Sequence, residues 1–357
     1  RLWSSGAYPI SFSFFFFLMI RRPPQSTLFP YTTLFRSRLD RPLTSADLTA
    51  IRQELDPWRG IVTSRYELDG QPVLVEACAH PDRDAIGVRI VSQLVAEGRL
   101  SVELAFPYGH HGGEGGVWDR PGAHRTTMTP RGARAADFDR RLDGDSYAAR
   151  LAWEGAAAIR ETAPHTFVLA PGAGATSLVF ACEYAPRALP AVLPDLGSFF
   201  AASSEHWKKF WTTGGAIDLS GSRDPRWREL ERRIVLSQYL LAAQEAGSLP
   251  PQESGLFNNG WNGKFHLEMH WWHGAHYALW DRWPMFERSL GWYERIRPAA
   301  REAAERQGYR GARWPKMVGP EGRDSPSGVG PLLIWQQPHP IFYAELDHRR
   351  APGRATL

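Results

Sequence analysis

The chain has 357 residues, of which 43% are hydrophobic and 22% are charged, so it is long enough for two domains with a core each. Its formal net charge of +4 comes entirely from residues 1–37, which hold four arginines and no acidic residue. Without those four, 38 of the 42 basic side chains remain against 38 acidic ones, and this balance removes the case for a nucleic-acid partner.

Residues 1–37 have the features of neither a domain nor a targeting signal. The apolar run at 14–20 precedes Arg21 and Arg22, whereas a secretory signal carries its positive charge before the apolar core. The run is also shorter than the roughly 20 residues that cross a bilayer. From about residue 12 the segment (FFFFLMIRRPPQSTLFPYTTLFRS) resembles translated sequencing-adapter sequence at the ends of metagenomic reading frames. We interpret residues 1–37 as non-native and expect no membrane partner, and the compartment stays open.

Residues 38–200 are predicted to form an antiparallel β-sandwich. Two runs of strand type, at 60–68 and 71–79, flank Asp69 and Gly70, a dipeptide typical of hairpin turns. Sequential antiparallel strands of this kind favour a sandwich. The further strand-like runs lie at 86–91, 100–106, 147–153, 166–170 and 177–184.

The two cysteines and two glycine-rich stretches of this region carry no sign of a cofactor site. Cys78 and Cys182 lie in strand-like runs and are expected to be buried thiols rather than a disulfide or metal site. The stretch at 109–116 lacks the ending of a P-loop, and the one at 171–177 lacks the third glycine of a dinucleotide fingerprint. Both are predicted to be loops, and the first could reach over a binding cleft.

Residues 201–255 are predicted to be linker helices. Ser203 or Ser204 can cap a short helix, and Asp224, which precedes a proline, is a start signal for a longer one. Gly247 and the two prolines after it are expected to end the second helix.

The segment at 258–282, NNGWNGKFHLEMHWWHGAHYALWDR, holds a dense group of polar and aromatic residues. Polar and apolar residues alternate from Lys264 to Trp271, which in an extended chain places every second residue on the same side. We therefore predict an extended entry and a helix that starts near His270. One cleft would then receive a cation, two imidazoles and a carboxylate, from Lys264, His266, Glu268 and His270.

Three interpretations of this group are open. A metal site could use His266 and His270, but HLEMH is not the HExxH pattern. A structural polar network could orient the first helix of the domain. Substrate binding would combine donors and acceptors for sugar hydroxyls with aromatic faces, and Trp272 and His273 would extend such a site. We favour substrate binding and expect no metal or other cofactor.

Two later loops add candidate ligand contacts. The first, at 308–326, carries Arg313, Trp314 and Lys316 before a stretch rich in glycine and proline. Polar loop residues between helices are often functional, although ordinary loop packing is the alternative for both loops. The second loop, at 332–340, carries Trp335, Gln336, Gln337 and His339.

The motif WNGKFHLEMHWWH, with FERSLGWYERIRPAAREAAERQGYRGARWP after it, resembles the opening helices of the six-hairpin glycosidases, especially glycoside hydrolase families 65 and 95. The resemblance covers about residues 200–345 and implies a β-sandwich followed by an (α/α)6 toroid. It places Glu268 on the substrate-binding carboxylate of family 65 and His266 near a binding-loop position of family 95. Lys316 departs from the family 65 pattern, which has tryptophan there, and both asparagines of the family 95 motif are absent.

The resemblance implies an inverting glycoside hydrolase or glycoside phosphorylase that acts on oligosaccharides without a cofactor. The general acid of these families would fall beyond Leu357, so we expect this fragment to be inactive alone. Twelve helices of about 12 residues with connections of about 5 need roughly 200 residues. Residues 256–357 number 102, which suffices for the first hairpins of a truncated toroid.

Two alternatives to a glycosidase are a non-catalytic carbohydrate-binding protein on the same scaffold and a polysaccharide lyase. A lyase would need a Tyr/His base pair and an arginine for a uronate, and Arg313 is the candidate for the latter. The sugar, its linkage and the oligomeric state are left open by the sequence.

Overall fold

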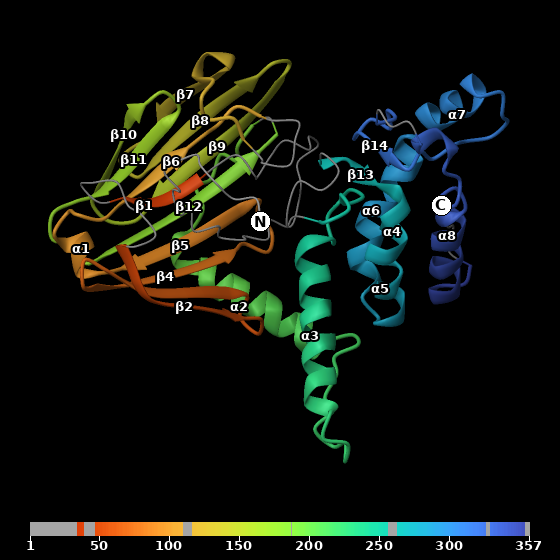
Figure 1. Cartoon of the computed structure of the whole chain (residues 1–357), viewed down its shortest axis with the longest axis horizontal. Coiled ribbons are helices and arrows are strands. Elements are labelled where there is room, and N and C mark those ends of the chain that lie inside the picture. Colours follow the sequence, from red (N-terminus) through yellow and green to blue (C-terminus); the bar gives the residue numbers. More distant parts are fainter. Residues whose placement is uncertain are drawn as a thin grey trace, which may run out of the picture. The chain divides into compact units, whose positions relative to one another are not determined.

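The computed structural model describes residues 34–38, 47–109, 116–186, 188–255, 263–325 and 329–353, the first of these ranges by its backbone only. The chain divides into two compact units, and the division falls between Ser204 and Glu205. The first unit is built from antiparallel sheets and the second mainly from helices, as the labels of Figure 1 show.

Two antiparallel sheets make up the first unit. The larger has eight strands in the order β2-β3-β4-β5-β12-β9-β8-β7, and the smaller has four in the order β1-β6-β11-β10. The sheets pack against each other where Phe138 on β8 meets Phe167 on β11, with ring centroids 4.8 Å apart. The predicted antiparallel β region is therefore confirmed. The strands are β1 (Leu34–Arg38), β2 (Leu48–Asp56), β3 (Ile61–Leu68), β4 (Gln71–Ala79), β5 (Ala85–Val91), β6 (Ser101–Ala105), β7 (His124–Pro130), β8 (Ala135–Leu142), β9 (Asp145–Trp153), β10 (Ala157–Ala163), β11 (Thr166–Pro171) and β12 (Ser177–Ala185).

The hairpin between β3 and β4 has the predicted turn. Asp69 and Gly70 both have positive φ, 50° and 72°, which is the backbone of a type I′ turn. Leu68 pairs with Gln71 at its base, so the turn sets the register of both strands. The short helix α1 (Gln93–Ala96) follows β5, and the short 3-10 helix η3 (Pro121–Ala123) precedes β7.

The boundary proposed at residue 37 falls within a strand. β1 pairs antiparallel with β6, from Leu34 opposite Ala105 to Arg38 opposite Ser101. Four of its five residues belong to the segment interpreted as non-native. The rest of that segment, residues 1–33, lies outside the described residues.

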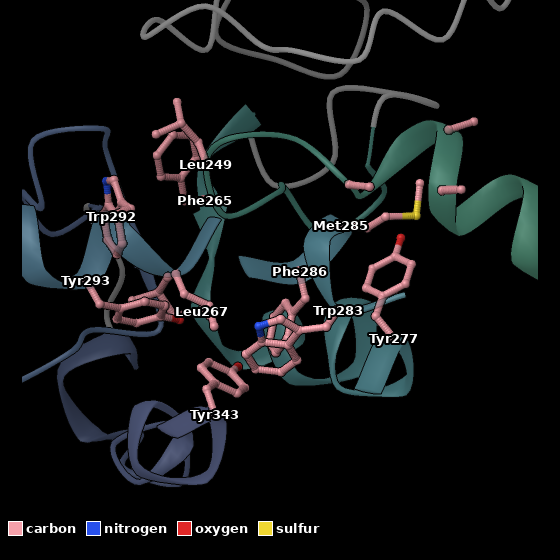
Figure 2. Close-up of a cluster of buried hydrophobic side chains, with 14 of the residues drawn as sticks. Leu249, Phe265, Leu267, Tyr277, Trp283, Met285, Phe286, Trp292, Tyr293 and Tyr343 are labelled. Carbon is pink, nitrogen blue, oxygen red and sulfur yellow. The ribbon is translucent and has the colours of Figure 1, made fainter. Parts of the chain in front are cut away.

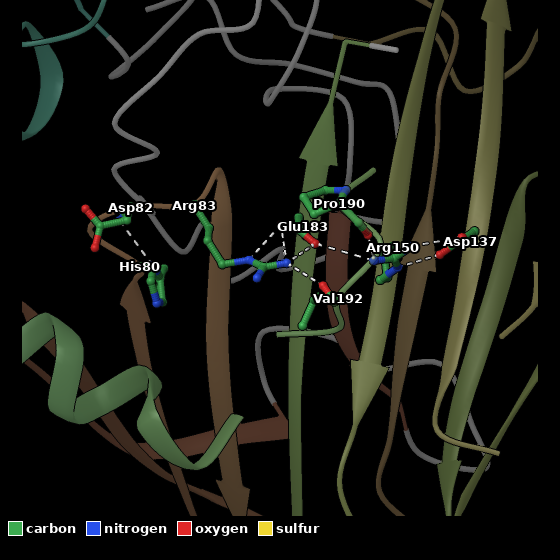
Figure 3. A network of polar contacts seen from close by, with 8 residues as sticks. All are labelled: His80, Asp82, Arg83, Asp137, Arg150, Glu183, Pro190 and Val192. Carbon is green, nitrogen blue, oxygen red and sulfur yellow. Dashed lines mark hydrogen bonds and ion pairs between the residues drawn. The ribbon is translucent and has the colours of Figure 1, made fainter. Parts of the chain in front are cut away.

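A polar network connects the segment after β12, which includes Pro190 and Val192, to the larger sheet, as Figure 3 shows. Arg150, whose side chain is 1% exposed, donates to both carboxylate oxygens of Asp137 at 2.6 and 3.1 Å and to the carbonyl of Pro190 at 2.6 Å. Arg83 donates to both oxygens of Glu183 and to the carbonyl of Val192. Bidentate arginine pairs of this kind are the strong members of their class.

Two long helices follow the strands. α2 (Leu196–Thr212) starts earlier than predicted, because Asp195 accepts a hydrogen bond from the backbone of Gly197 at its beginning. Ser203, predicted as a possible cap, lies inside the helix and donates to the carbonyl of Arg59 at 2.9 Å. α3 (Trp227–Gln244) starts just after Asp224 and its proline, as predicted.

The second unit continues with short helices and a two-stranded sheet. Its aromatic core, shown in Figure 2, surrounds Phe286 and Tyr343, whose ring centroids lie 4.8 Å apart. The elements are β13 (Phe265–His266), α4 (Leu267–Gly274), α5 (His276–Leu279), α6 (Trp283–Arg295), α7 (Arg297–Arg306), β14 (Met317–Val318), the 3-10 helix η5 (Gly330–Leu332) and α8 (His339–Arg350).

Several large apolar side chains of this unit remain exposed. Ile341 on α8 is 72% exposed, and Leu332 and Ile334 just before it are 75% and 65% exposed. Among the described helices, none is both long and apolar enough to cross a membrane.

Candidate functional site

The candidate site forms where two distant segments meet in the small sheet of the second unit. Phe265 pairs with Val318 and His266 pairs with Met317. The backbone N–H of Leu267 donates to the carbonyl of Lys316 at 2.8 Å and extends this pairing by one bond. The motif around Glu268 and the loop around Lys316 are thereby brought side by side.

The helix of this motif starts earlier than predicted. The chain is extended only over Phe265 and His266, and α4 begins at Leu267 instead of near His270. His266 explains the difference because its Nδ1 accepts a hydrogen bond from the backbone N–H of Met269 at 3.3 Å, as an N-cap does. The prediction that one side of an extended chain carries all four polar groups is therefore wrong beyond His266.

Three charged groups surround the buried imidazole of His266. Oε2 of Glu268 lies 2.8 Å from Nζ of Lys316, and the side chains of this ion pair are 19% and 17% exposed. Nε2 of His266 lies 3.9 Å from Oε2 of Glu268 and 3.7 Å from Oε2 of Glu253. Both distances are longer than a hydrogen bond, so His266 is not bonded to either carboxylate. The three charged groups and the imidazole line one polar site.

His266 is neutral near neutral pH. Burial lowers its pKa to about 4, against the opposing effect of Glu268. Since its Nδ1 accepts from Met269, its single proton lies on Nε2, which faces the two carboxylates. The site therefore presents one N–H donor, one ammonium and two carboxylates.

Two carboxylate oxygens of the site are buried acceptors, Oε2 of Glu268 and Oε2 of Glu253. The ammonium of Lys316 at 2.8 Å compensates Oε2 of Glu268 as an ion pair. Oε2 of Glu253 accepts no hydrogen bond from any residue that the structure describes. Buried acceptors are nearly always satisfied in native proteins, so a ligand rich in donors fits this site.

His270 belongs to the core and not to this polar group. It is 1% exposed, and its two ring nitrogens lie 2.9 Å from the hydroxyl of Tyr293 and 2.9 Å from that of Ser289. Ser289 donates to the carbonyl of Phe286, so His270 donates to Ser289 through Nε2 and accepts from Tyr293 through Nδ1. Because α4 is already helical at His270, the side chain points into the core, where it bonds Tyr293 and Ser289.

The remaining predicted residues of the motif lie in three different environments. Lys264 is half-buried beside β13, and Trp272 is 62% exposed on the outer side of α4. His273 is buried, with Nε2 3.0 Å from the carbonyl of Glu253 and Nδ1 3.6 Å from Oε2 of Glu245. Only His273 among these three contacts the loop that carries Glu253.

Some of the residues predicted in the two later loops are hydrogen-bonded to one another. Gln337 accepts a hydrogen bond from the backbone N–H of Trp314 and donates to its carbonyl, both at 2.7 Å. Gln336 is buried and donates to the same carbonyl at 3.1 Å. The Trp314 ring packs edge-on against Tyr293 at 5.4 Å. These glutamines therefore fix the backbone two residues before Lys316.

The other predicted loop residues contribute less to the polar group. Nδ1 of His339 lies 3.2 Å from the carbonyl of Leu267 at the start of α4. The guanidinium of Arg313 lies over the ring of Tyr309, 5.9 Å from its centroid, and Trp335 is 53% exposed. The structure thus brings together His266, Glu268 and Lys316, while Arg313 lies over Tyr309 and Trp335 is largely exposed to solvent.

Sequence reasoning missed Glu253 and Glu245. Glu253 reaches the site because the backbone N–H of His266 donates to the carbonyl of Pro251 at 3.0 Å, which draws the preceding loop alongside β13. The prolines at 250 and 251 indicate only a helix stop, and a pairing between loop and strand leaves no periodic signal in a sequence. The described residues contain no group of three histidine, cysteine or acidic side chains that could hold a metal ion.

Comparison with known proteins relates the chain to solved structures only. No protein-family model matches it, and no curated protein matches it. A putative kojibiose phosphorylase from human microbiome matches with a TM-score of 0.63 and 9% identity, over 87% of this chain and 44% of that chain. A bacterial glucoamylase, solved in complex with acarbose, matches with a TM-score of 0.56 and 10% identity, over 90% of this chain and 52% of that chain.

At 9% and 10% identity these are likenesses of fold alone, and the fold that this chain shares is that of a phosphorylase and of a glucoamylase. This chain spans about half the length of each of the two matched structures.

Proposed function

We propose that this chain is part of an inverting glycoside hydrolase or glycoside phosphorylase that acts on oligosaccharides. Its segments would be a β-sandwich at 38–200, linker helices at 201–255 and the first hairpins of an (α/α)6 toroid at 256–357. The fold that this chain shares with a putative phosphorylase and a glucoamylase supports this assignment. Fold alone does not specify chemistry, so the polar site must carry the functional part of the proposal.

The observation that carries the proposal is the pair of buried acceptors on Glu253 and Glu268. Sugar hydroxyls are donors, and a carboxylate that accepts from them makes charge-assisted hydrogen bonds. Lys316 and the Nε2–H of His266 supply the donors for ring and hydroxyl oxygens. One polar site thus offers both partners that a polyol requires.

Aromatic side chains complete the proposed site. Trp314 is half-buried, two glutamines bond its backbone, and its ring packs edge-on against Tyr293 at 5.4 Å. A fixed aromatic face can stack on the C–H surface of a sugar ring. We propose that Lys264, His266, Glu268, Trp314 and Lys316 contact the sugar together with Glu253, and that Gln336, Gln337 and His339 position them.

The general acid is proposed to lie outside residues 38–357. In the families that the sequence resembles, it lies far beyond the segment equivalent to Glu268, and the matched structures are about twice the length of this chain. The chain should therefore bind oligosaccharides without turning them over. Hydrolysis and phosphorolysis are distinguished by whether the complete protein requires phosphate.

The test of the proposal is calorimetric titration of the whole chain with acarbose and a set of disaccharides. Saturable binding that Glu268→Gln weakens and Glu302→Gln leaves unchanged would support it. Glu302 is a matched control because it is an exposed carboxylate on α7, paired only with Arg306 at 2.8 Å among its described contacts. No saturation with any of these sugars would contradict the proposal.

A non-catalytic carbohydrate-binding protein is the alternative that the same site would allow, because ligand binding alone does not require an acid. The complete protein separates the two: turnover of a disaccharide marks an enzyme, and binding without turnover marks a binding protein.

A further inference from the structure

The loop that carries Glu253 is fastened to the candidate site through its backbone. The carbonyl of Pro251 accepts from the backbone N–H of His266, and the carbonyl of Glu253 lies 3.0 Å from Nε2 of His273. Within the loop, the N–H of Gly255 donates to the carbonyl of Gln252 at 3.0 Å. The position of the Glu253 carboxylate therefore depends on His273.

The bond to Glu253 fixes the tautomer of His273. A backbone carbonyl only accepts, so Nε2 of His273 must carry the proton. In a neutral imidazole the other nitrogen, Nδ1, is then an acceptor. It accepts no hydrogen bond from the described residues and is buried.

The side chain that faces Nδ1 is the carboxyl group of Glu245, at the C-terminal end of α3. Its Oε2 lies 3.6 Å from Nδ1, and the two side chains are 9% and 8% exposed. Oε2 is buried and accepts no hydrogen bond from any described residue. A Cβ on Gly255, where φ is +56°, would collide with this carboxyl group, so glycine lets the loop approach Glu245 closely.

Burial favours the uncharged form of both members of this pair. It raises the pKa of Glu245 well above its ordinary value and lowers the pKa of His273 to about 4. The other titratable groups around His273 are His266 and His276, which also lower its pKa, and Glu253, which contacts it through its backbone. A neutral carboxylic acid carries the O–H that Nδ1 lacks, and an O–H···N bond between them requires the 3.6 Å separation to shorten to about 3 Å.

We infer that Glu245 and His273 are positioning residues for the candidate site. Glu245 acts as a neutral acid that holds His273 in its Nε2–H tautomer, and this tautomer holds the Glu253 loop so that its carboxylate stays beside His266. The inference rests on the proposed function only for what Glu253 binds. His273, expected from the sequence to contact the sugar, then acts through Glu253 instead.

The pair makes the site sensitive to alkaline pH. When Glu245 ionises, a carboxylate faces the lone pair of Nδ1, and two acceptors repel each other. The imidazole must then move its proton to Nδ1 or bind a second one, and the first of these releases the carbonyl of Glu253. Glutamine at position 245 keeps a neutral donor toward Nδ1 and cannot ionise.

The first test measures the tautomer of His273 by ¹⁵N NMR of the whole chain labelled at histidine. Wild type should show the Nε2–H form near pH 7 and lose it at higher pH, while Glu245→Gln keeps it throughout. A doubly protonated or Nδ1–H imidazole in wild type near pH 7 would overturn the inference, and so would an identical pH response in both proteins.

The second test titrates the same proteins with acarbose. Glu245→Gln should match wild type within about twofold near pH 7 and abolish the alkaline loss of affinity, whereas His273→Phe should weaken binding by about tenfold, or roughly 1.4 kcal/mol. Unchanged affinity in His273→Phe would overturn the positioning role. If wild type bound no sugar, the proposed function would fail, while the NMR result would still decide the state of the Glu245–His273 pair.

Discussion

The substitution Glu268→Gln removes the charge of the carboxylate and keeps the shape of the side chain. In Glu268→Gln the side chain keeps its length and one acceptor oxygen, but it loses the ion pair with Lys316 at 2.8 Å. The two side chains are about one-fifth exposed, so water screens the pair in part. The substitution should therefore change ligand binding more than folding.

The expected magnitudes differ enough to be separated. A charge-assisted hydrogen bond contributes about 1.5–3 kcal/mol, so loss of one such bond to a sugar hydroxyl should raise Kd by about 10- to 150-fold. Ion pairs with exposed side chains contribute about 0.2–1 kcal/mol, and this partly exposed pair should lie near the upper end. For a unit of this size, about 1 kcal/mol corresponds to a Tm shift of about 2–4 °C.

Kd for acarbose and Tm are to be measured on one preparation of each protein. Glu302→Gln, which replaces an exposed carboxylate on α7, should change neither. A large drop in Tm of Glu268→Gln with near-normal Kd would show that Glu268 is only a structural partner of Lys316 and does not bind the sugar.

Three further predictions concern stability. The pKa of His266 is lowered to about 4 in the folded protein, so the second unit should lose stability as pH falls from about 6.5 to 4, by at most about 3 kcal/mol. His266→Asn keeps an N-cap acceptor and cannot be protonated, so it should flatten this pH dependence in denaturant melts at several pH values. Arg150→Met should destabilise the first unit by about 2–4 kcal/mol in urea unfolding, since it leaves Asp137 and Glu183 short of a buried partner, and an unchanged midpoint would contradict this. Deletion of residues 1–37 should leave the β-sheet signal in circular dichroism intact, because β6 keeps its pairing with β11, and loss of that signal would show that the segment belongs to the fold.

The parts of the fold that the sequence predicted are those with local signals. The turn at Asp69 and Gly70 needs two residues with positive φ, and that dipeptide supplies them. The strands that it missed include β2 and β8. β2 is exposed along most of both faces, so it shows no apolar alternation. β8 carries Arg140 and Asp137, and these charged residues interrupt the apolar alternation that predicts a strand.

Charges of this kind depend on partners that are distant in sequence. Arg140 is fully buried in the structure, yet it donates to the carbonyl of Pro107 and to Thr126, which lie on other segments. No local pattern indicates that an arginine will be satisfied in this way. Burial of a charge is decided by tertiary contacts, which periodicity cannot show.

The structure brings together some of the residues that the sequence singled out, together with others that it did not. Alternation drew attention to His266 and Glu268, which do lie beside Lys316. The same alternation misplaced His270, because an imidazole cap at His266 starts the helix three residues earlier. Glu253 was missed because it arrives through the backbone bond between Pro251 and His266.

The most direct test is a crystal structure of the chain soaked with acarbose. Sugar density is expected between Glu253 and Glu268, with hydroxyl oxygens about 2.5–3.0 Å from Oε2 of each carboxylate. Density at the exposed tryptophans alone, with both carboxylates unchanged, would show that this polar site does not bind the oligosaccharide.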